Sequence, residues 1–469
     1  MRKGLVKVLA VLVSLSAASG AASGQAPTML ATEAPSRADE RAWMRDAGFG
    51  MFIHFGLYSI PAGVWKGKPM GRNDYIEWIR TQWDFPKLKG IPQQEYDTLL
   101  DRFDPAGFDA DRIAGAAQAA GMKYIVLTSK HHDGFALWPS AVGGYDVSHT
   151  PFAGRGRDLL GELVAAARRR GLKVGFYYSH WQDWKEPGGA FPVWMPPARS
   201  DAAFQRYWQG KALPQVRELL ERYQPDMLWF DTWEQQAKDH ITAARRDELI
   251  ALIHRLSPRT LINGRIAAHD PAGADFLSMM DNEFPPADAP EMPWETPATM
   301  SRSWGHSVLN YDWLTSERMV RMRMDAQSRG GALTLNIGPD GTGAIPAVQL
   351  RRLRELAAWE EVNREAVEGV RPWAYRLPYG DHAITMREQG DTTIVYVARF
   401  EHTPRLSIRL PDALAGGEIV SAKVIETDQV QDAGIRGDRL SLTFGKQVDL
   451  LSNPVVRIAV RPARPVNAK

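Results

Sequence analysis

The 469-residue sequence contains no cysteine, so the protein forms no disulfide and has no thiol that could be oxidised. Charge of either sign is also not in excess. The chain has 57 Lys and Arg against 55 Asp and Glu, a formal net charge of +2, and no long basic run. This balance argues against a nucleic-acid partner. Beyond the first two dozen residues, no apolar stretch is long enough to predict a membrane span.

The first residues instead have the pattern of a secretory signal peptide, predicted over residues 1–24. Arg2, Lys3 and Lys7 come first, and a short apolar run from Val8 to Leu15 follows. Small residues then supply a cleavage signature, and the apolar part is too short for a stable anchor. We therefore expect an exported bacterial protein, periplasmic or extracellular, which the absence of cysteine suits.

A unit of helix followed by apolar strand recurs along the chain, at residues 109–132, 157–184, 216–233 and 247–265. Each helical pattern ends at a Gly or Pro, and each strand ends in polar residues. This alternation predicts parallel strands. No Gly-rich phosphate turn follows an early strand, which argues against a doubly wound nucleotide-binding sheet. We predict an α/β fold, a (β/α)8-type TIM barrel, over residues 35–366.

The pattern changes after Arg371, Pro372 and Trp373. Segments such as "HAITMREQGDTTIVYVARF" alternate apolar and polar residues, with Gly and Asp at the turns. Alternation with a period of two is typical of antiparallel strands that bury one face. We predict a C-terminal antiparallel β-sandwich domain over residues 370–469, without catalytic residues.

Polar side chains follow the predicted strands of the barrel, and these strand ends carry chemistry in such folds. They are His54, His131, His132, Tyr177, Ser179, Asp231 and Arg265. Asp231 is the strongest candidate, because it follows the apolar stretch "DMLWF" directly. A lone Asp in a loop is more often a helix cap or an ion-pair partner, but convergence with the other strand ends favours a functional role here.

Retaining glycoside hydrolysis needs a second carboxylate about 5 Å from the first. The segment "ADFLSMMDNEFPPADAP" offers Asp275, Asp281 and Glu283, although all three could be ordinary solvated loop acids.

The adjacent pair His131 and His132 fits substrate hydrogen bonding better than metal binding. Neighbouring residues at a strand end point to opposite sides, and the sequence has no H-x-H or H-x-x-x-H arrangement. We predict no metal and no cofactor.

Several of these stretches occur in order over about 300 residues: "FGMFIHFGLYS", "YIEW", "KYIVLTSKHHDGFALW", "GFYYS", "PDMLWFD", "INGR" and "GGALTLNIGPDGTGAIP". Together they resemble the retaining α-L-fucosidases of glycoside hydrolase family 29. The resemblance implies an exo-acting enzyme that removes terminal α-L-fucosyl groups from glycans by double displacement, through a covalent fucosyl-enzyme. The partner would be a fucosylated glycan or oligosaccharide.

The resemblance also implies roles for individual residues. Asp231 matches the nucleophile. A further set matches residues that line the sugar pocket or hydrogen-bond the fucose hydroxyls: His54, Glu77, Trp78, His131, His132, Tyr177, Trp229 and Arg265. Trp304 matches an aromatic residue that packs on the C5 methyl group of the sugar.

The acid/base is where this chain departs from the family. Many members carry a Thr-Pro-Glu-like run, whereas this sequence has "SMMDNEFP". Counting back from Pro285 places Asp281 at the usual glutamate position, with Glu283 two residues later. We favour Asp281 over Glu283.

Three alternatives to a fucosidase stay open: a retaining glycosidase for a related sugar such as an α-L-galactoside, a non-catalytic sugar-binding protein, and a metal hydrolase that uses the histidine pair.

Overall fold

The computed structural model describes residues 37–71, 75–192, 200–232, 237–268, 270–285, 290–373, 382–400, 405–444 and 453–463. The signal peptide predicted over residues 1–24 lies outside the described residues. Arg37–Lys469 form one compact unit, so the division predicted between residues 366 and 370 stays a prediction.

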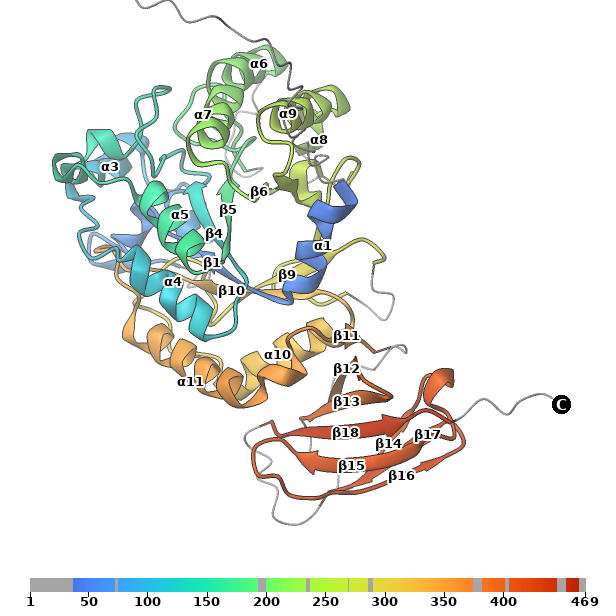
Figure 1. Cartoon of the computed structure of the whole chain (residues 1–469). Coiled ribbons are helices and arrows are strands. Elements are labelled where there is room, and N and C mark those ends of the chain that lie inside the picture. The colour runs from blue at the N-terminus through green and yellow to red at the C-terminus, as the bar shows by residue number, and fades with distance from the viewer. Residues whose placement is uncertain are drawn as a thin grey trace, which may run out of the picture. The chain divides into compact units, whose positions relative to one another are not determined.

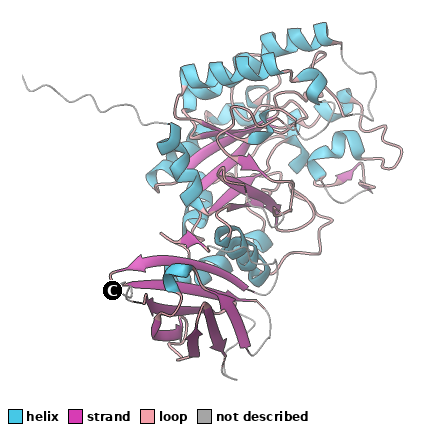
Figure 2. Ribbon diagram, turned by 90° about the vertical axis from the view of Figure 1, so that its right-hand side faces the viewer, coloured by secondary structure: helices cyan, strands magenta, loops and turns pink. Residues whose placement is uncertain are grey.

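Eight parallel strands form the central sheet (Figures 1 and 2). Its spatial order is β7-β6-β5-β4-β1-β10-β9-β8. The strands are β1 (Phe49–Ile53), β4 (Tyr124–Lys130), β5 (Lys173–Tyr178), β6 (Met227–Trp229), β7 (Leu261–Ile262), β8 (Leu277–Ser278), β9 (Trp294–Thr299) and β10 (Ala332–Ile337). The residues of β1, β4, β6, β9 and β10 are all buried, as expected for parallel strands covered on both faces.

The four predicted helix–strand units are confirmed. The helices α4 (Ala110–Ala119), α5 (Leu159–Arg169), α7 (Leu213–Tyr223) and α9 (Ala243–Leu256) precede β4, β5, β6 and β7 in turn. Side-chain caps define where two of them begin. Asp109 accepts a hydrogen bond from the backbone N–H of Arg112 at 2.9 Å, and Asp158 accepts one from Gly161 at 3.1 Å.

The predicted barrel is confirmed only as a curled parallel sheet, because the strand ladder does not close. The strands β7 and β8 are the two edges of the sheet. Within the described part of the chain, a single isolated bridge, Asn263 to Phe276, joins these edges. Each edge strand has only two residues, too few for a continuous ladder, and Pro271 and Gly273 lie in the turn between them.

The C-terminal region folds into two antiparallel sheets. The larger has the order β11-β12-β13-β18-β15, and the smaller has the order β14-β17-β16. Their strands are β11 (Arg371–Pro372), β12 (His382–Gln389), β13 (Thr392–Arg399), β14 (Arg405–Arg409), β15 (Glu418–Val424), β16 (Asp432–Arg436), β17 (Arg439–Thr443) and β18 (Val455–Arg461).

Alternation along β13 explains how the larger sheet is buried on both faces. Val395 and Val397 belong to a cluster that also contains Leu440 of the smaller sheet. Ile394 and Tyr396, which point to the opposite face, join the core of the parallel-sheet region. The helices α10 (Ser316–Ser328) and α11 (Ala347–Asn363) follow β9 and β10, and α10 contacts β12.

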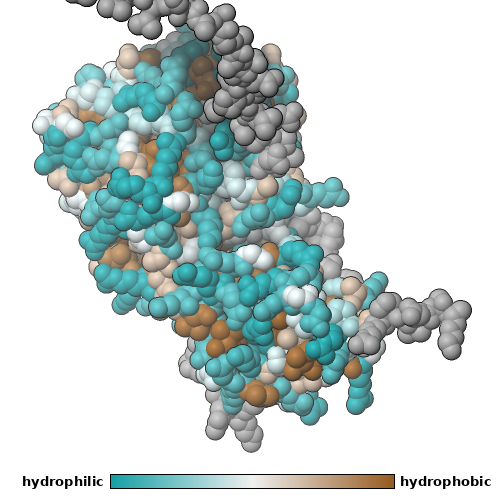
Figure 3. Space-filling model, viewed as in Figure 1, coloured by the Kyte–Doolittle hydropathy of each residue, from teal (hydrophilic) through white to brown (hydrophobic). Residues whose placement is uncertain are grey.

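The described helices include none that is both long and apolar enough to cross a membrane. The face of the molecule shown in Figure 3 is largely hydrophilic, with small separate hydrophobic patches.

Candidate active site

A cavity of about 490 Å³ opens among the carboxyl ends of the parallel strands. Eleven of the predicted site residues line it: His54, Glu77, Trp78, His131, Tyr177, Trp229, Asp231, Arg265, Asp281, Glu283 and Trp304. Of the residues to which the family resemblance gave a role, only His132 is not part of the described lining. Residues from eight separate segments of the chain thus converge on one concave site, as expected where the carboxyl ends of parallel strands meet.

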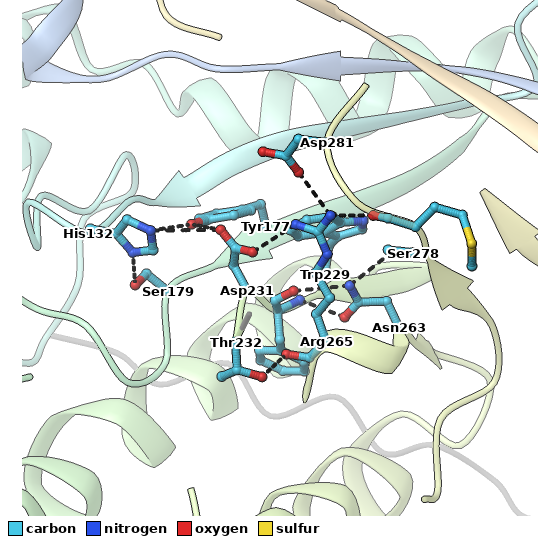
Figure 4. A network of polar contacts seen from close by, with 12 residues as sticks. His132, Tyr177, Ser179, Trp229, Asp231, Thr232, Asn263, Arg265, Ser278 and Asp281 are labelled. Carbon is cyan, nitrogen blue, oxygen red and sulfur yellow. Dashed lines mark hydrogen bonds and ion pairs between the residues drawn. The ribbon is translucent and has the colours of Figure 1, made fainter. Parts of the chain in front are cut away.

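Asp231 lies two residues beyond the end of β6, and its position is fixed on several sides (Figure 4). Arg265 donates from Nη1 to Asp231 Oδ1 at 3.0 Å, and the Tyr177 hydroxyl donates to Oδ2 at 3.3 Å. The indole of Trp181 donates to the backbone carbonyl of Asp231 at 2.8 Å. Both the carboxylate and the backbone of this residue are therefore held in place.

Burial raises the pKa of Asp231 to about 6. The ion pair with Arg265 opposes this shift, and the nearby carboxylate of Asp281 adds to it. The 3.0 Å contact with Arg265 alone would suggest a low pKa, but the side chain is only 14% exposed, so desolvation of the charged form outweighs the ion pair. At neutral pH the group is ionised, at a cost to the folded state.

This cost predicts that Asp231→Asn stabilises the fold at neutral pH. The pKa of Asp231 is higher in the folded protein than in the unfolded chain. The contribution of this group to the free energy of unfolding is therefore greatest at pH values below the unfolded-state pKa, and it is lost as the pH rises through about 6. We expect the variant to gain about 1–3 kcal/mol in the free energy of unfolding at pH 7.5, and almost nothing at pH 4. Urea unfolding of both proteins at the two pH values measures the difference. A less stable variant at pH 7.5 would show that the ion pair outweighs burial.

The two acid/base candidates differ in their surroundings. Arg265 donates from Nη2 to Asp281 Oδ1 at 2.9 Å, so one guanidinium contacts both Asp281 and Asp231. The same Nη2 also donates to the backbone carbonyl of Met279. Glu283 is exposed at the cavity wall. Asp281 is thus a close neighbour of Asp231, and Glu283 has more room to move.

Asp275, the third carboxylate of this segment, is a structural residue. Its side chain is fully buried. It accepts from Arg41 Nε at 3.0 Å and from the backbone N–H of Ile262 at 3.0 Å. Both contacts hold the edge of the sheet, outside the described lining of the cavity.

The adjacent histidines have different surroundings. His131 lines the cavity, whereas His132 lies behind it with Nε2 at 3.7 Å from Asp231 Oδ2. The Ser179 hydroxyl donates to the carbonyl of Gln182 at 2.7 Å, so it must accept from His132 Nδ1 at 2.6 Å. The proton of the neutral ring is therefore on Nδ1, and the Nε2 lone pair points to the Asp231 side. Burial holds the pKa of His132 well below its usual value.

The same reasoning assigns the tautomer of His54. Asn336 donates its amide to the carbonyl of Trp304 at 2.7 Å, so Asn336 Oδ1 accepts from His54 Nδ1, also at 2.7 Å. Burial lowers the pKa of His54 to about 3. Its Nε2 is then an acceptor suited to a sugar hydroxyl. Burial also lowers the pKa of His131, so all three rings are neutral at physiological pH.

Stacked aromatic rings line the cavity near Asp231. The ring of His131 stacks on Tyr177 with centroids 5.2 Å apart, and Tyr177 stacks on Trp229 at 5.4 Å. The Arg265 guanidinium lies over Trp229, 5.0 Å from its centroid. Trp304 packs beside His54 at 4.9 Å. The site therefore combines apolar ring faces with hydrogen-bonding edges, which suits a sugar.

The residues near the cavity mouth were not predicted from the sequence. Five of them are Tyr75, Gln82, Phe85, Leu88 and Met280. Phe85 is 39% exposed and Met280 is 55% exposed, so the outer wall of the cavity is partly apolar. Gln82 is the last residue of the short helix α2 (Ile79–Gln82), Phe85 and Leu88 follow it, and none of the three comes after a predicted strand. The tryptophan-rich segment 180–197 contributes no described residue to the lining, and its residues 193–197 lie outside the description.

No cluster of three or more His, Cys, Asp or Glu side chains that could hold a metal ion occurs among the described residues.

The α-L-fucosidase family model matches residues 16–365 of this chain. The human plasma α-L-fucosidase is 32% identical over 351 residues, which cover 71% of this chain and 70% of that protein. The human tissue α-L-fucosidase is 28% identical over 446 residues, 92% of this chain and 89% of that protein.

Solved structures agree with these relatives. An α-L-fucosidase of glycoside hydrolase family 29 from Bacteroides thetaiotaomicron, trapped as a covalent intermediate with 2-fluoro-fucosyl fluoride, has a TM-score of 0.76 at 27% identity. The match covers 91% of this chain and 97% of that one. An α-L-fucosidase from Lactobacillus casei in complex with α-L-fucose has a TM-score of 0.60 at 33% identity, covering 70% and 99%. The chain therefore belongs to the α-L-fucosidases of glycoside hydrolase family 29.

Proposed function

We propose that this protein is an exo-acting retaining α-L-fucosidase that hydrolyses terminal α-L-fucosyl linkages of glycans. The observation that carries the proposal is the pairing of two cavity carboxylates, Asp231 and Asp281, by the single guanidinium of Arg265. Retaining hydrolysis requires two carboxyl groups about 5 Å apart, one as nucleophile and the other as acid/base.

In the first step, Asp231 attacks the anomeric carbon of the bound fucoside from the face opposite the leaving group. The bond to the glycosidic oxygen breaks, and the acid donates its proton to that oxygen. The product is a β-linked fucosyl-enzyme. In the second step the same acid/base takes a proton from water, which attacks the anomeric carbon and releases α-L-fucose and free Asp231.

We assign the proton transfer to Asp281, because Asp281 is the carboxylate that Arg265 connects to the nucleophile. Glu283 is the alternative, since it lines the same cavity and is exposed. Arg265 and Tyr177 orient Asp231 and hold its charge. Below the raised pKa of Asp231 its carboxyl group is protonated, and Oδ2 then lies 3.7 Å from the neutral Nε2 of His132.

The remaining lining residues bind the sugar. His54 and His131 offer ring nitrogens to hydroxyl groups, and Glu77, held at 3.0 Å by the backbone N–H of Gly305, offers a buried carboxylate. Trp78 and Trp229 close the sides. Trp304 supplies an apolar face for the C5 methyl group, which distinguishes fucose from L-galactose.

A retaining α-L-galactosidase and a non-catalytic sugar-binding protein are the alternatives. Both are tested by comparing kcat/KM on aryl α-L-fucoside and aryl α-L-galactoside with the purified protein. L-galactose has a hydroxymethyl group where fucose has the C5 methyl group, and this polar group would lie against Trp304. We therefore expect kcat/KM to be about 10- to 100-fold lower for the galactoside than for the fucoside. Equal rates would contradict the assignment of Trp304, and binding of fucose without release from either substrate would favour the binding protein.

We further propose that the curled eight-stranded sheet is a (β/α)8-type barrel whose seam lies between β7 and β8, and that the two C-terminal sheets form a β-sandwich. We also propose export to the periplasm or the cell exterior, on the pattern of residues 1–24 alone.

A further inference from the structure

A fully buried carboxylate, Glu295 of β9, lies beneath the cavity without being part of its described lining. Its Oε1 accepts from the Trp229 indole at 2.5 Å and from the Ser278 hydroxyl at 2.8 Å. Its Oε2 accepts from the Tyr124 hydroxyl at 3.1 Å and from the Thr334 hydroxyl. The four donors come from four different strands, β6, β8, β4 and β10.

One route leads from Glu295 to the nucleophile through Trp229. The bond to Glu295 fixes the rotation of the indole in its plane. The face of that indole carries the Arg265 guanidinium at 5.0 Å, and Tyr177 stacks on it at 5.4 Å. These are the two side chains that donate to the Asp231 carboxylate. A shift of the indole would move both donors at once.

A second route leads through Ser278 and Asn263. The Ser278 hydroxyl donates to Glu295, so it accepts from Asn263 Nδ2 at 3.2 Å. The Asn263 side chain makes two hydrogen bonds to the backbone of Phe230, the residue before the nucleophile. Its Oδ1 accepts from the Phe230 N–H at 2.8 Å, and its Nδ2 donates to the Phe230 carbonyl at 3.0 Å. Figure 4 shows this path from Ser278 through Asn263 to the backbone beside Asp231.

We infer that Glu295 is a positioning residue, which fixes the Asp231 carboxylate through Trp229 and the Asp231 backbone through Asn263. The inference rests on the proposed function of Asp231 as nucleophile. A carboxyl group buried away from water is costly to desolvate, and the four hydrogen-bond donors around Glu295 compensate for this cost. An apolar side chain at position 295 could pack the strands together equally well. The Trp229 indole and the Ser278 hydroxyl, by contrast, both need a hydrogen-bond acceptor there.

The test compares two substitutions at Glu295. Glu295→Leu removes the acceptor for both routes, and Glu295→Gln keeps one oxygen for Trp229 and Ser278. Because misplacement of a reacting group by about 1 Å can cost about 100-fold in rate, we expect Glu295→Leu to lower kcat about 10- to 100-fold, with KM changed less than about threefold. Glu295→Gln should restore kcat to within about threefold of wild type.

Two further variants keep the test informative if Glu295→Leu folds poorly. Ser278→Ala cuts only the Asn263 route and should lower kcat by about 3- to 10-fold. Glu360→Gln is the matched control, because Glu360 is equally buried and pairs with Arg323 at 2.5 Å, away from the described lining of the cavity. It should lower the unfolding temperature without changing kcat.

The pH at which kcat/KM falls on the acidic side of its pH profile (the acidic limb) is a further measurement, and it would not change if Glu295 only stabilised the fold. Weaker contacts from Arg265 and Tyr177 leave the Asp231 charge less compensated, so the limb should shift to higher pH in Glu295→Leu. Wild-type kcat, KM and limb in this variant would overturn the inference and leave the proposed function intact.

Binding of a fucose-configured iminocyclitol, measured by calorimetry, separates the two proposals. Its ammonium group pairs with Asp231, so Glu295→Leu should bind it about tenfold more weakly. If the wild-type protein binds the iminocyclitol but hydrolyses no fucoside, the proposed function fails, while a tenfold loss in the variant still supports positioning. Unchanged binding in the variant would contradict positioning.

Discussion

Asp231→Gly should lower kcat on an aryl α-L-fucoside by about 10⁴-fold or more, because the variant has no carboxylate at this position to form the bond to the anomeric carbon. The side chain that accepts from Arg265 and Tyr177 is the one that forms the bond to the anomeric carbon in the proposed mechanism. Steady-state kinetics with a nitrophenyl fucoside measures the loss, and circular dichroism checks that the variant is folded.

Azide distinguishes a lost nucleophile from a damaged site. In Asp231→Gly the small anion can enter the space of the carboxylate beside Arg265 and attack from the same face, opposite the leaving group. We expect added azide to restore activity and to yield β-L-fucosyl azide, since one displacement inverts the configuration. The α-azide, or no effect of azide in a folded variant that still binds fucose, would contradict Asp231 as the nucleophile.

Asp281→Asn should produce a loss that depends on the leaving group. A poor leaving group, such as the alcohol of an alkyl fucoside, needs a proton as its bond breaks, so kcat/KM should fall about 10²- to 10⁴-fold. A dinitrophenolate leaves without that proton, and kcat/KM for this substrate should fall less than about tenfold. Because kcat/KM reports only the steps up to formation of the fucosyl-enzyme, slow hydrolysis of the intermediate does not confuse the comparison.

Glu283→Gln is the control on the same substrates, since Glu283 lines the same cavity two residues away. It should keep kcat/KM within about threefold for both leaving groups. The opposite pattern, with dependence on the leaving group in Glu283→Gln and none in Asp281→Asn, would assign the acid/base to Glu283. Flat behaviour in both variants would show that neither residue donates the proton.

Much of the site was predictable because periodicity alone locates the strands. The helical and strand patterns place His54, His131, Tyr177, Asp231 and Arg265 at strand ends, and parallel strands bring those ends together. The family resemblance added Glu77 and Trp78, which lie in a short 3-10 helix, and Trp304, which lies in a loop. The position of His132 behind the cavity was not predicted, because alternation says that two neighbours diverge but not which one faces the ligand.

Other features depend on contacts between distant segments. Glu295 lies in the strand "WETPAT", where a single acidic residue suggests a solvent-facing position, and only the folded sheet brings Trp229, Ser278, Tyr124 and Thr334 to it. Asp275 was weighed as a catalytic partner, but Arg41, 234 positions earlier in the chain, gives it a structural role. The opening between β7 and β8 follows from strand lengths of two residues, shorter than hydrophobic patterns can resolve.

The configuration of the first-formed sugar distinguishes hydrolysis through a fucosyl-enzyme from direct attack by water. The purified protein would be mixed with an aryl α-L-fucoside, and the anomeric proton of the released fucose followed by NMR before mutarotation. Double displacement through Asp231 predicts that α-L-fucose appears first and that the β anomer grows in later. Initial release of β-L-fucose would mean a single displacement by water, and would contradict the assignment of Asp231 as a nucleophile.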